Sequence, residues 1–483
     1  MSFLSEILTF HSTKTTKFIL LLVAVLCGVG AYFDLWQLAL LPLFIMALYL
    51  CYQKPIHYVL LICFLVPLSI FINDVGGGLG LSLPTEPMIW MVFVMFIYQL
   101  LIRNVLDWSV IKQPLVIAIL VNLLWMFLSM LNSSMPFVSF KYFLARTWFV
   151  TVFFFFLLYA FKDVSTIRRF FTFMLYGTFI VVSITLFKHS KEGFSRGWGY
   201  SIMQPFFEDH TIYSAYISFF IPVALMFSLR GNWFNLKVWH RLFFFLVFVV
   251  LMVGIVFSFT RASWISLIVA LGFYGLIKLK VKFQHLLMVI GLVALVAVVK
   301  QDQILYSLEG NKQGSADDLE SHAQSVSNIT TDPSNLERLN RWQCAVLMFK
   351  SRPVFGYGPG TYTFQYAPFQ RPESLTLIST NSGDLGNTHN EYLNALSEMG
   401  LLGALSWLAV FLLSIYTGLH VVYDPDQLAW KKSLATATVL GLITYYVHAF
   451  LNNFSDFDKI AVPLWGFMAV LTALKFYTKK ERI

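Results

Sequence analysis

The feature that most constrains this chain is the recurrence of apolar runs long enough to cross a membrane. The first is Phe18–Phe33, and similar runs follow along most of the 483 residues. A transmembrane helix needs about 20 mostly apolar residues, and in lipid its backbone must satisfy its own hydrogen bonds. Only 12% of the residues are charged, against about 25% in soluble domains. The sequence therefore predicts an all-α polytopic membrane protein.

The apolar runs predict about 14 transmembrane helices, within a range of 12–14. No cleavage site follows the first run, so we expect it to remain as a helix. Further spans are expected near 35–51, 57–72, 87–102, 113–131, 145–161, 166–187, 211–229, 241–259, 262–277, 284–299, 392–419, 433–451 and 460–477. The spans 57–72 and 87–102 are short enough to be tilted or re-entrant.

The distribution of lysine and arginine predicts the orientation. Twenty of them fall on the side of the two termini. The short loops on the other side hold seven, namely Lys141, Arg146, Lys188, Lys191, Arg196, Arg261 and Lys459. Cytoplasmic loops carry the excess of positive charge, so both termini are expected in the cytoplasm. The net charge of +9 therefore reflects topology and not nucleic-acid binding.

This topology divides the chain into five parts. They are N-terminal helices (1–187), a first exterior loop (188–210), central helices (211–299), a large exterior loop (300–390) and C-terminal helices (391–483). In the large loop, Glu309–Leu336 is polar and expected to be flexible. A helix is expected from Glu337, with Trp342, Ala345, Val346 and Phe349 on its apolar face. The glycine cluster Gly356, Gly358 and Gly360 predicts a turn, which either presents N–H groups to an anion or is a plain turn.

The stretch Asn387–Gly403 predicts the start of a membrane helix. Thr388 and Glu391 have the spacing of a capping box, which would place His389 in the first helical turn with Tyr392 on the same side. An imidazole at this boundary could act as a base or contact a phosphate. Alternatively, it simply faces water.

Several cations are expected on the same exterior face. Arg261 lies between two apolar runs, where it either binds an anion or reaches lipid phosphate. Arg338 and Arg341 share a helix face and suit bidentate phosphate contacts, unless they pair with Glu337. Arg196 and the run Glu208-Asp209-His210 belong to the first exterior loop, as acceptor-side or phosphate-side groups or as ordinary interfacial polarity.

The sequence contains no His-Glu-x-x-His motif and no metal-type Cys/His spacing. Its four cysteines do not suggest a disulfide framework. We therefore expect no metal and no cofactor. Cations and histidines on one face fit a site that binds a lipid-linked anion such as a diphosphate and transfers a group.

Four motifs resemble the O-antigen ligase and polymerase superfamily over about Phe207–Gly403. They are Thr260-Arg261 opening a span, Arg338-x-x-x-Trp342, Pro353-x-x-Gly356-x-Gly358-Pro-Gly360 and His389-Asn390-x-Tyr392-Leu393-x-x-x-x-Glu398-x-Gly400-x-x-Gly403. The chain departs from many relatives at Phe207–His210, where they carry an asparagine.

The resemblance implies a membrane glycosyltransferase fold of the C class (GT-C) in the bacterial inner membrane. Such enzymes transfer a glycan from undecaprenyl diphosphate to an acceptor on the periplasmic face, without a metal. It implies that Arg261 and Arg338 bind the diphosphate and that His389 acts as a base or orients the reacting groups. The residues Arg196, Arg341, His210, Asn390, Tyr392 and Glu398 are expected to bind substrate.

Several functions remain open at this point. The first is an O-antigen ligase that joins the glycan to lipid A-core. A polymerase extending a lipid-linked repeat unit would share the donor site, as would a protein O-glycosyltransferase. A polysaccharide transporter or flippase would need substrate groups near the bilayer midplane and two related halves, and the sequence shows neither.

Overall fold

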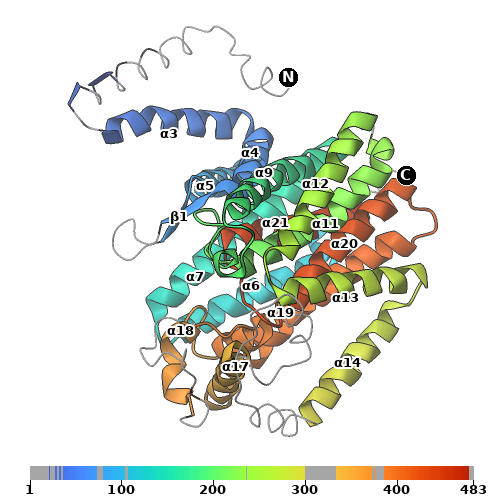
Figure 1. Ribbon diagram of the computed structural model, residues 1–483. Coiled ribbons are helices and arrows are strands. Elements are labelled where there is room, and N and C mark those ends of the chain that lie inside the picture. The colour runs from blue at the N-terminus through green and yellow to red at the C-terminus, as the bar shows by residue number, and fades with distance from the viewer. Residues whose placement is uncertain are drawn as a thin grey trace.

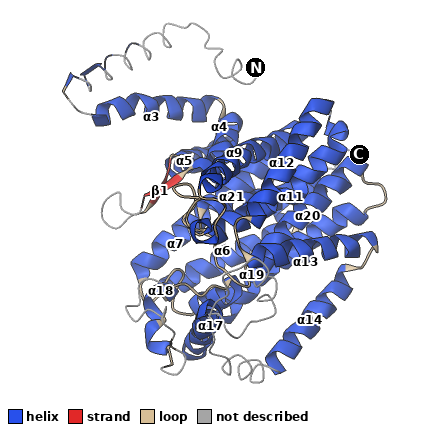
Figure 2. Cartoon of the chain, viewed as in Figure 1, coloured by secondary structure: helices blue, strands red, loops and turns tan. Residues whose placement is uncertain are grey.

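The structure is a computed structural model that describes residues 36–72, 80–103, 107–234, 236–299, 333–371 and 386–477, with residue 375 and a few positions between 21 and 33. The described chain is almost entirely helical, and its one sheet is a two-stranded hairpin (Figure 2). The predicted all-α membrane class is confirmed apart from this hairpin. Most of the predicted first span, and the predicted flexible segment as far as residue 332, lie outside the described residues.

The helices follow one another through both halves of the chain. The first half contains α3 (Trp36–Gln53), α4 (Pro55–Leu65), α5 (Thr85–Arg103), α6 (Pro114–Leu131), α7 (Pro136–Phe149), α8 (Leu157–Ala160), α9 (Val164–Lys191), α10 (Arg196–Gly199) and α11 (His210–Arg230). The second half contains α12 (Val238–Val256), α13 (Arg261–Lys278), α14 (Phe283–Val299), α17 (Pro333–Ser351), α18 (Tyr362–Gln365), α19 (Glu391–Tyr423), α20 (Ala429–His448) and α21 (Asp458–Phe476). The strands are β1 (Ile70–Ile72) and β2 (Leu81–Leu83).

Each predicted span from 35–51 onward contains one of these helices. Among the described residues, nine helical segments are long and apolar enough to cross a membrane. The chain is thus a multi-pass membrane protein, and fourteen spans remain a prediction.

The predicted span at 145–161 begins too late. A π-helical segment, Val150–Phe156, joins α7 to α8, and the continuous apolar helix runs from Pro136 to Ala160. Proline suits the first turn of a helix because its missing N–H has no partner there anyway. Lys141 and Arg146 therefore lie inside a membrane helix and not in a short loop. Arg146 is buried, which requires a partner for its charge.

The helix in the predicted span 57–72 ends before the span does. Helix α4 continues as a short 3-10 turn to Leu68, and the chain then forms β1, which pairs antiparallel with β2. Ile70 lies opposite Leu83 in this register. The β-branched Ile70 and Ile72 favour a strand over a further helical turn. The hairpin lies at the side of the bundle, next to the lower part of α5 (Figure 1).

The core of the bundle is built by α11 and α21, with α19 and α20 packed against them. In α21, 89% of the membrane-length segment is buried, and in α11 the share is 83%, against 22% in α5. Figure 1 shows α11, α20 and α21 side by side, with α17 and α18 gathered at the lower end of the bundle and α14 extending away from it. The lower end therefore brings the start of α19 and the helix α17 together.

The glycine turn of the large loop packs against a sharp kink in α19. Gly400 has φ = 67°, outside the helical region, and Leu401 donates its N–H to the carbonyl of Pro353 at 3.0 Å. Gly358 donates to the backbone carbonyl of Glu398 at 2.8 Å. The buried Glu398 carboxylate accepts the N–H groups of Gly360 and Tyr362, each at 2.9 Å. The turn's N–H groups thus fasten it to α19, and these contacts favour the plain-turn interpretation.

We predict that Gly400→Ala destabilises the protein. An added Cβ would lie 2.1 Å from the carbonyl oxygen of Val354, in a backbone conformation that alanine rarely adopts. The expected loss is at least ~1–3 kcal/mol, measured as a lower midpoint of thermal unfolding in detergent. Gly275→Ala in α13 is the matched control, because a Cβ there meets nothing within 4 Å. Equal midpoints for the two variants would contradict the docking of the turn.

Candidate functional site

Four separate elements bring cations and histidines together at the lower end of the bundle. Arg261 is the first residue of α13, His210 is the first of α11, Arg338 lies on α17, and His389 lies directly before α19. Thr260, which precedes Arg261, donates its hydroxyl to the backbone carbonyl of His210 at 3.3 Å. These residues are far apart in sequence, so only the packing of the helices places them at one site.

Arg338 is the charge that connects this cluster. Its guanidinium lies within electrostatic reach of His210, His389 and His448. Arg338 is half-buried, whereas Arg341 one turn later is 3% exposed. The structure therefore brings the predicted residues His210, Arg338 and His389 together, and Arg261 follows the Thr260 that bonds His210. We name these four residues the cation cluster.

The start of α19 differs from the predicted capping box. Asn390 is the N-cap, and its side-chain oxygen accepts the N–H groups of Tyr392 at 3.0 Å and Leu393 at 2.9 Å. The hydroxyl of Thr388 donates instead to Asn394 at 2.8 Å. Asparagine satisfies the free N–H groups at a helix start as well as threonine does. The sequence therefore contains two residues that could cap α19, Thr388 and Asn390, and Asn390 is the N-cap in the structure. The prediction of the cap was wrong by two residues.

His389 consequently lies outside the helix. Its backbone adopts the left-handed region with φ = 49°, and its N–H donates to the side chain of Asn387 at 2.9 Å. Non-glycine residues with positive φ are uncommon and are often found at functional sites. This conformation directs the imidazole into the cation cluster and not along the face of α19.

The imidazole of His389 is uncharged at neutral pH. Burial, followed by the positive charges of Arg338 and Arg341, lowers the pKa of His389 to about 4, and a hydrogen bond with Asn452 opposes the shift. Its buried Nδ1 has no hydrogen-bond partner in the described part of the chain. A neutral imidazole with an available nitrogen can accept a proton.

Sequence reasoning missed two residues that complete this site, His448 and Asn452. The Nε2 of His448 lies 2.8 Å from the hydroxyl of Ser263 in α13, and its Nδ1 lies 3.2 Å from the amide of Asn452. Asn452 also bonds His389. The available signal was their spacing of four residues at the end of an apolar helix. This chain of contacts ties α13, α20 and His389 to one another.

Arg341 has a different role from Arg338. Its Nε lies 2.6 Å from the carboxylate of Glu337, and its guanidinium lies 4.0 Å above the ring of Tyr366. The predicted apolar face of α17 is rotated by one residue, because its buried positions are Glu337, Asn340, Arg341, Cys344, Ala345 and Met348. The sequence left open whether Arg338 and Arg341 pair with Glu337. The structure shows this ion pair for Arg341.

Three further residues predicted to bind substrate make contacts within the protein. Asn390 caps α19 and donates its amide to the carbonyl of Phe450 at 3.0 Å. Tyr392 donates its hydroxyl to the carbonyl of Tyr446 at 3.1 Å. The carboxylate of Glu398 binds the glycine turn, as described above. We assign these three side chains to the support of the site.

Arg196 lies at the rim of the cluster. Its Nε donates to the hydroxyl of Tyr200 at 2.8 Å, and the ring of Tyr200 packs edge-on against His210 at 4.7 Å. The guanidinium of this half-buried residue also reaches His210 electrostatically. Arg196 therefore lies next to the cation cluster.

A buried network that the sequence did not predict braces the segment after α20. Arg146 forms an ion pair with Asp456 at 2.5 Å, lies 4.3 Å above the ring of Trp407, and donates to the hydroxyl of Ser455 at 3.0 Å. Ser455 in turn donates its N–H at 2.7 Å and its hydroxyl at 3.0 Å to Glu391. The network holds residues 452–456 against the first turn of α19, next to His389.

The described residues contain no group of three or more His, Cys, Asp or Glu side chains placed to hold a metal ion. The absence of a metal cofactor remains a prediction.

Comparison with known proteins points to a family. Residues 246–408 match the model of the family described as O-antigen ligase. This match supports membership of the O-antigen ligase superfamily. The matched segment contains Arg261, Arg338 and His389.

A protein of Haemophilus influenzae described as uncharacterized is similar to this chain. The two are 22% identical over 202 residues, which cover 41% of this chain and 47% of that protein. The chain thus matches about half the length of this relative. Its description states no activity, so the similarity adds nothing to the choice among acceptors.

We predict that Arg341→Leu lowers stability more than Arg338→Leu does. Removal of Arg341 leaves the buried Glu337 without this ion pair, and breaking a buried pair typically costs about 3–5 kcal/mol. Thermal unfolding of the two single variants and of the double variant E337Q/R341L provides the measurement. The double variant is expected to recover part of the loss. A drop of similar size for Arg338→Leu would show that both arginines are structural.

Proposed function

We propose that the protein moves a glycan from undecaprenyl diphosphate to a hydroxyl of lipid A-core, on the periplasmic face of the bacterial inner membrane and without a metal ion. The observation that carries the proposal is that an uncharged His389 lies within electrostatic reach of Arg338 and is linked through Asn452 and His448 to Ser263, two residues after Arg261. A base and an anion-binding pair in one place are what glycosyl transfer from a diphosphate requires.

The proposed step is a displacement at the anomeric carbon. The acceptor oxygen forms a bond to this carbon, the bond from the carbon to the diphosphate oxygen breaks, and the hydroxyl proton passes to His389. Undecaprenyl diphosphate leaves with the bonding electron pair. Arg261 and Arg338 stabilise the charge that develops on it, and preorganised positive groups are effective in such a role because they need no rearrangement.

The first turn of α13 adds to this anion site. Arg261 stands at the helix N-terminus, where free N–H groups and the helix dipole favour negative charge. A phosphate there would contact both the guanidinium and the helix end. His448, held by Ser263 of the same turn and by Asn452, then links the anion site to the base.

The alternative within the same family is polymerisation, in which the acceptor is another lipid-linked repeat unit. The family match supports polymerisation as much as ligation. The matched residues 246–408 contain Arg261, Arg338 and His389, which we assign to donor binding and to the base, and both reactions need these groups. Residues 204–210 and 449–459 lie outside the match and also border the site. The acceptor is therefore to be decided by experiment.

The experiment is a gel of surface glycans from a deletion strain. Bare lipid A-core, with long chains accumulated on the lipid carrier, is expected for a ligase. Lipid A-core with a single repeat unit and no long chains would identify a polymerase. A wild-type pattern would contradict both and direct attention to a protein acceptor.

We predict that Arg261→Ala and Arg338→Ala each lower the transfer rate by roughly 10²–10³-fold, the loss typical of removing one transition-state donor. Purified variants are assayed with the lipid-linked donor, and thermal unfolding confirms that they fold. Lys350→Ala, at the exposed end of α17, is the control and keeps wild-type activity. Intact activity of either arginine variant would remove it from the donor site. Loss of activity in EDTA that magnesium restores would contradict the metal-free mechanism.

We predict an unusually acidic pH limit for the free enzyme. His389 must be deprotonated to act as a base, and its pKa is lowered to about 4, so kcat/KM falls only as the pH drops through about 4. In the donor complex the diphosphate offsets Arg338 and Arg341, so the acid limit of kcat lies at higher pH. His389→Gln removes this limit and lowers kcat by about 10²–10⁴-fold. An acid limit of kcat/KM near the ordinary histidine value would contradict the assignment.

A further inference from the structure

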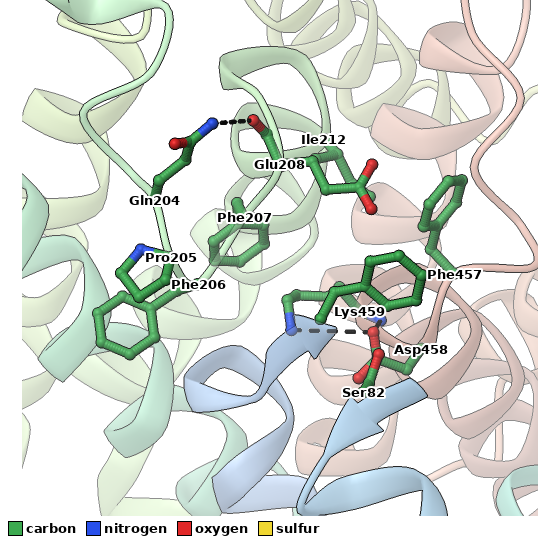
Figure 3. Close-up of a pocket in the computed structure, with 11 residues that line it drawn as sticks. Ser82, Gln204, Pro205, Phe206, Phe207, Glu208, Ile212, Phe457, Asp458 and Lys459 are labelled. Atoms are coloured by element: carbon green, nitrogen blue, oxygen red, sulfur yellow. Dashed lines mark hydrogen bonds and ion pairs between the residues drawn. The ribbon is translucent and has the colours of Figure 1, made fainter. Parts of the chain in front are cut away.

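A cavity of about 490 Å³ lies beside the cation cluster and has no role in the step described above. Its walls are the β1–β2 hairpin, the segment 204–212 and the first turn of α21 (Figure 3). The volume falls within the range of roughly 300–1,000 Å³ that is typical of small-molecule sites. It can thus hold a short ligand but not a long chain.

The floor of the cavity is a buried ion pair that is already satisfied. The Nζ of Lys459 lies 3.8 Å from Asp458 and donates to the carbonyls of Val66 at 3.1 Å and Ser69 at 3.0 Å. Asp458 also accepts the hydroxyl of Ser69 at 2.9 Å. Because the ammonium is enclosed by these acceptors, it has little capacity to attract an anion from solution. The floor is rigid and close to electrically neutral.

The rest of the lining combines polar edges with exposed aromatic rings. Glu208 and Gln204 are exposed on one wall, and the Gln204 amide donates to the backbone of Glu208 at 3.2 Å. Phe71 and Phe457 are 38% and 37% exposed at the opposite walls, and Figure 3 shows Phe206 and Phe457 on either side of the opening. Exposed aromatic rings that gather at one cavity form an apolar patch, and such patches can mark ligand-binding grooves.

This lining excludes several ligand classes. Glu208 adds a negative charge to a balanced floor, so a phosphate or an acidic sugar would be repelled. The described residues hold no cluster of metal-binding side chains here. An apolar lipid chain would remove the exposed Glu208 carboxylate and Gln204 side chain from water. An uncharged sugar ring fits, since its C–H face can pack on an aromatic ring while its hydroxyls bond a carboxylate and an amide.

Two chain segments connect the cavity directly to the cation cluster. Glu208 and Ile212 line the cavity, and His210 between them belongs to the cluster. Phe457 and Lys459 line it as well, and Asn452 of the same connection bonds His389. A glycan whose reacting end lies at His389 therefore extends naturally into this cavity.

We propose that this cavity binds uncharged sugar rings of a glycan substrate next to the reacting centre, through Glu208, Gln204 and the surrounding phenylalanine rings. The proposal rests on the proposed function for the identity of the substrate. The sugar rings come either from the acceptor core or from the donor chain, which offer the same chemistry. In this arrangement the diphosphate binds the arginines of the cation cluster, and the uncharged sugar rings bind beside the carboxylate of Glu208.

The test is a binding measurement on the purified full-length protein in lipid nanodiscs, without the lipid-linked donor. The probes are the core oligosaccharide and the O-chain oligosaccharide released from the lipopolysaccharide of the source organism, followed by saturation-transfer NMR. One of the two is expected to bind. Glu208→Gln and Phe206→Ala are expected to weaken its binding at least about tenfold. Binding of the core assigns the cavity to the acceptor, and binding of the O-chain assigns it to the donor.

The controls separate this proposal from the proposed function. Glu192→Gln removes an exposed carboxylate in the same exterior loop but outside the cavity, and it leaves binding unchanged. Arg338→Ala lowers the transfer rate by roughly 10²–10³-fold but leaves oligosaccharide binding unchanged. If Phe206→Ala does not fold, Glu208→Gln decides alone. Binding of neither oligosaccharide, or equal binding by Glu208→Gln and wild type, overturns the proposal, whether or not the protein transfers glycans.

Discussion

The requirement that every buried charge have a partner governs the part of this helix bundle that carries the cation cluster. A charge in a low-dielectric environment is costly unless an opposite charge and hydrogen bonds satisfy it. Arg146 of α7 meets this requirement with Asp456, which lies 310 residues later. Lys459 meets it with carbonyls of the segment that follows α4. Such pairs join elements that the lipid alone would leave free to slide past one another.

The same requirement fixes the position of His389. Glu391, two residues later, is buried and accepts hydrogen bonds from Ser455 and from the hydroxyl of Tyr445 at 2.8 Å. Glu398, further along α19, accepts the N–H groups of the glycine turn that follows α17. The two carboxylates anchor α19 to the α20–α21 connection on one side and to the large loop on the other. His389 and Arg338 face each other as a consequence.

The cation cluster differs from these buried ion pairs and anchored carboxylates. Its arginines come from α13 and α17 and its histidines from α11 and the start of α19, whereas the carboxylates nearby mostly bind other parts of the protein. The net result is a local excess of positive charge beside a neutral imidazole. The cavity next to it has the opposite character, with a surplus carboxylate and aromatic rings. A substrate with an anionic end and an uncharged body matches the two regions together.

The sequence by itself determined the membrane class and the approximate place of most spans, and it predicted Arg261, Arg338 and His389 as site residues. Hydropathy is a local property, because lipid imposes the same demand on each segment separately. Only the tertiary structure decided which of two neighbouring arginines is structural, because Arg341 is buried against Tyr366 and Arg338 is not. It also decided the roles of Arg146, Asp456, His448 and Asn452. Each of these depends on contacts between residues far apart in the chain, and a local pattern carries no information about such contacts.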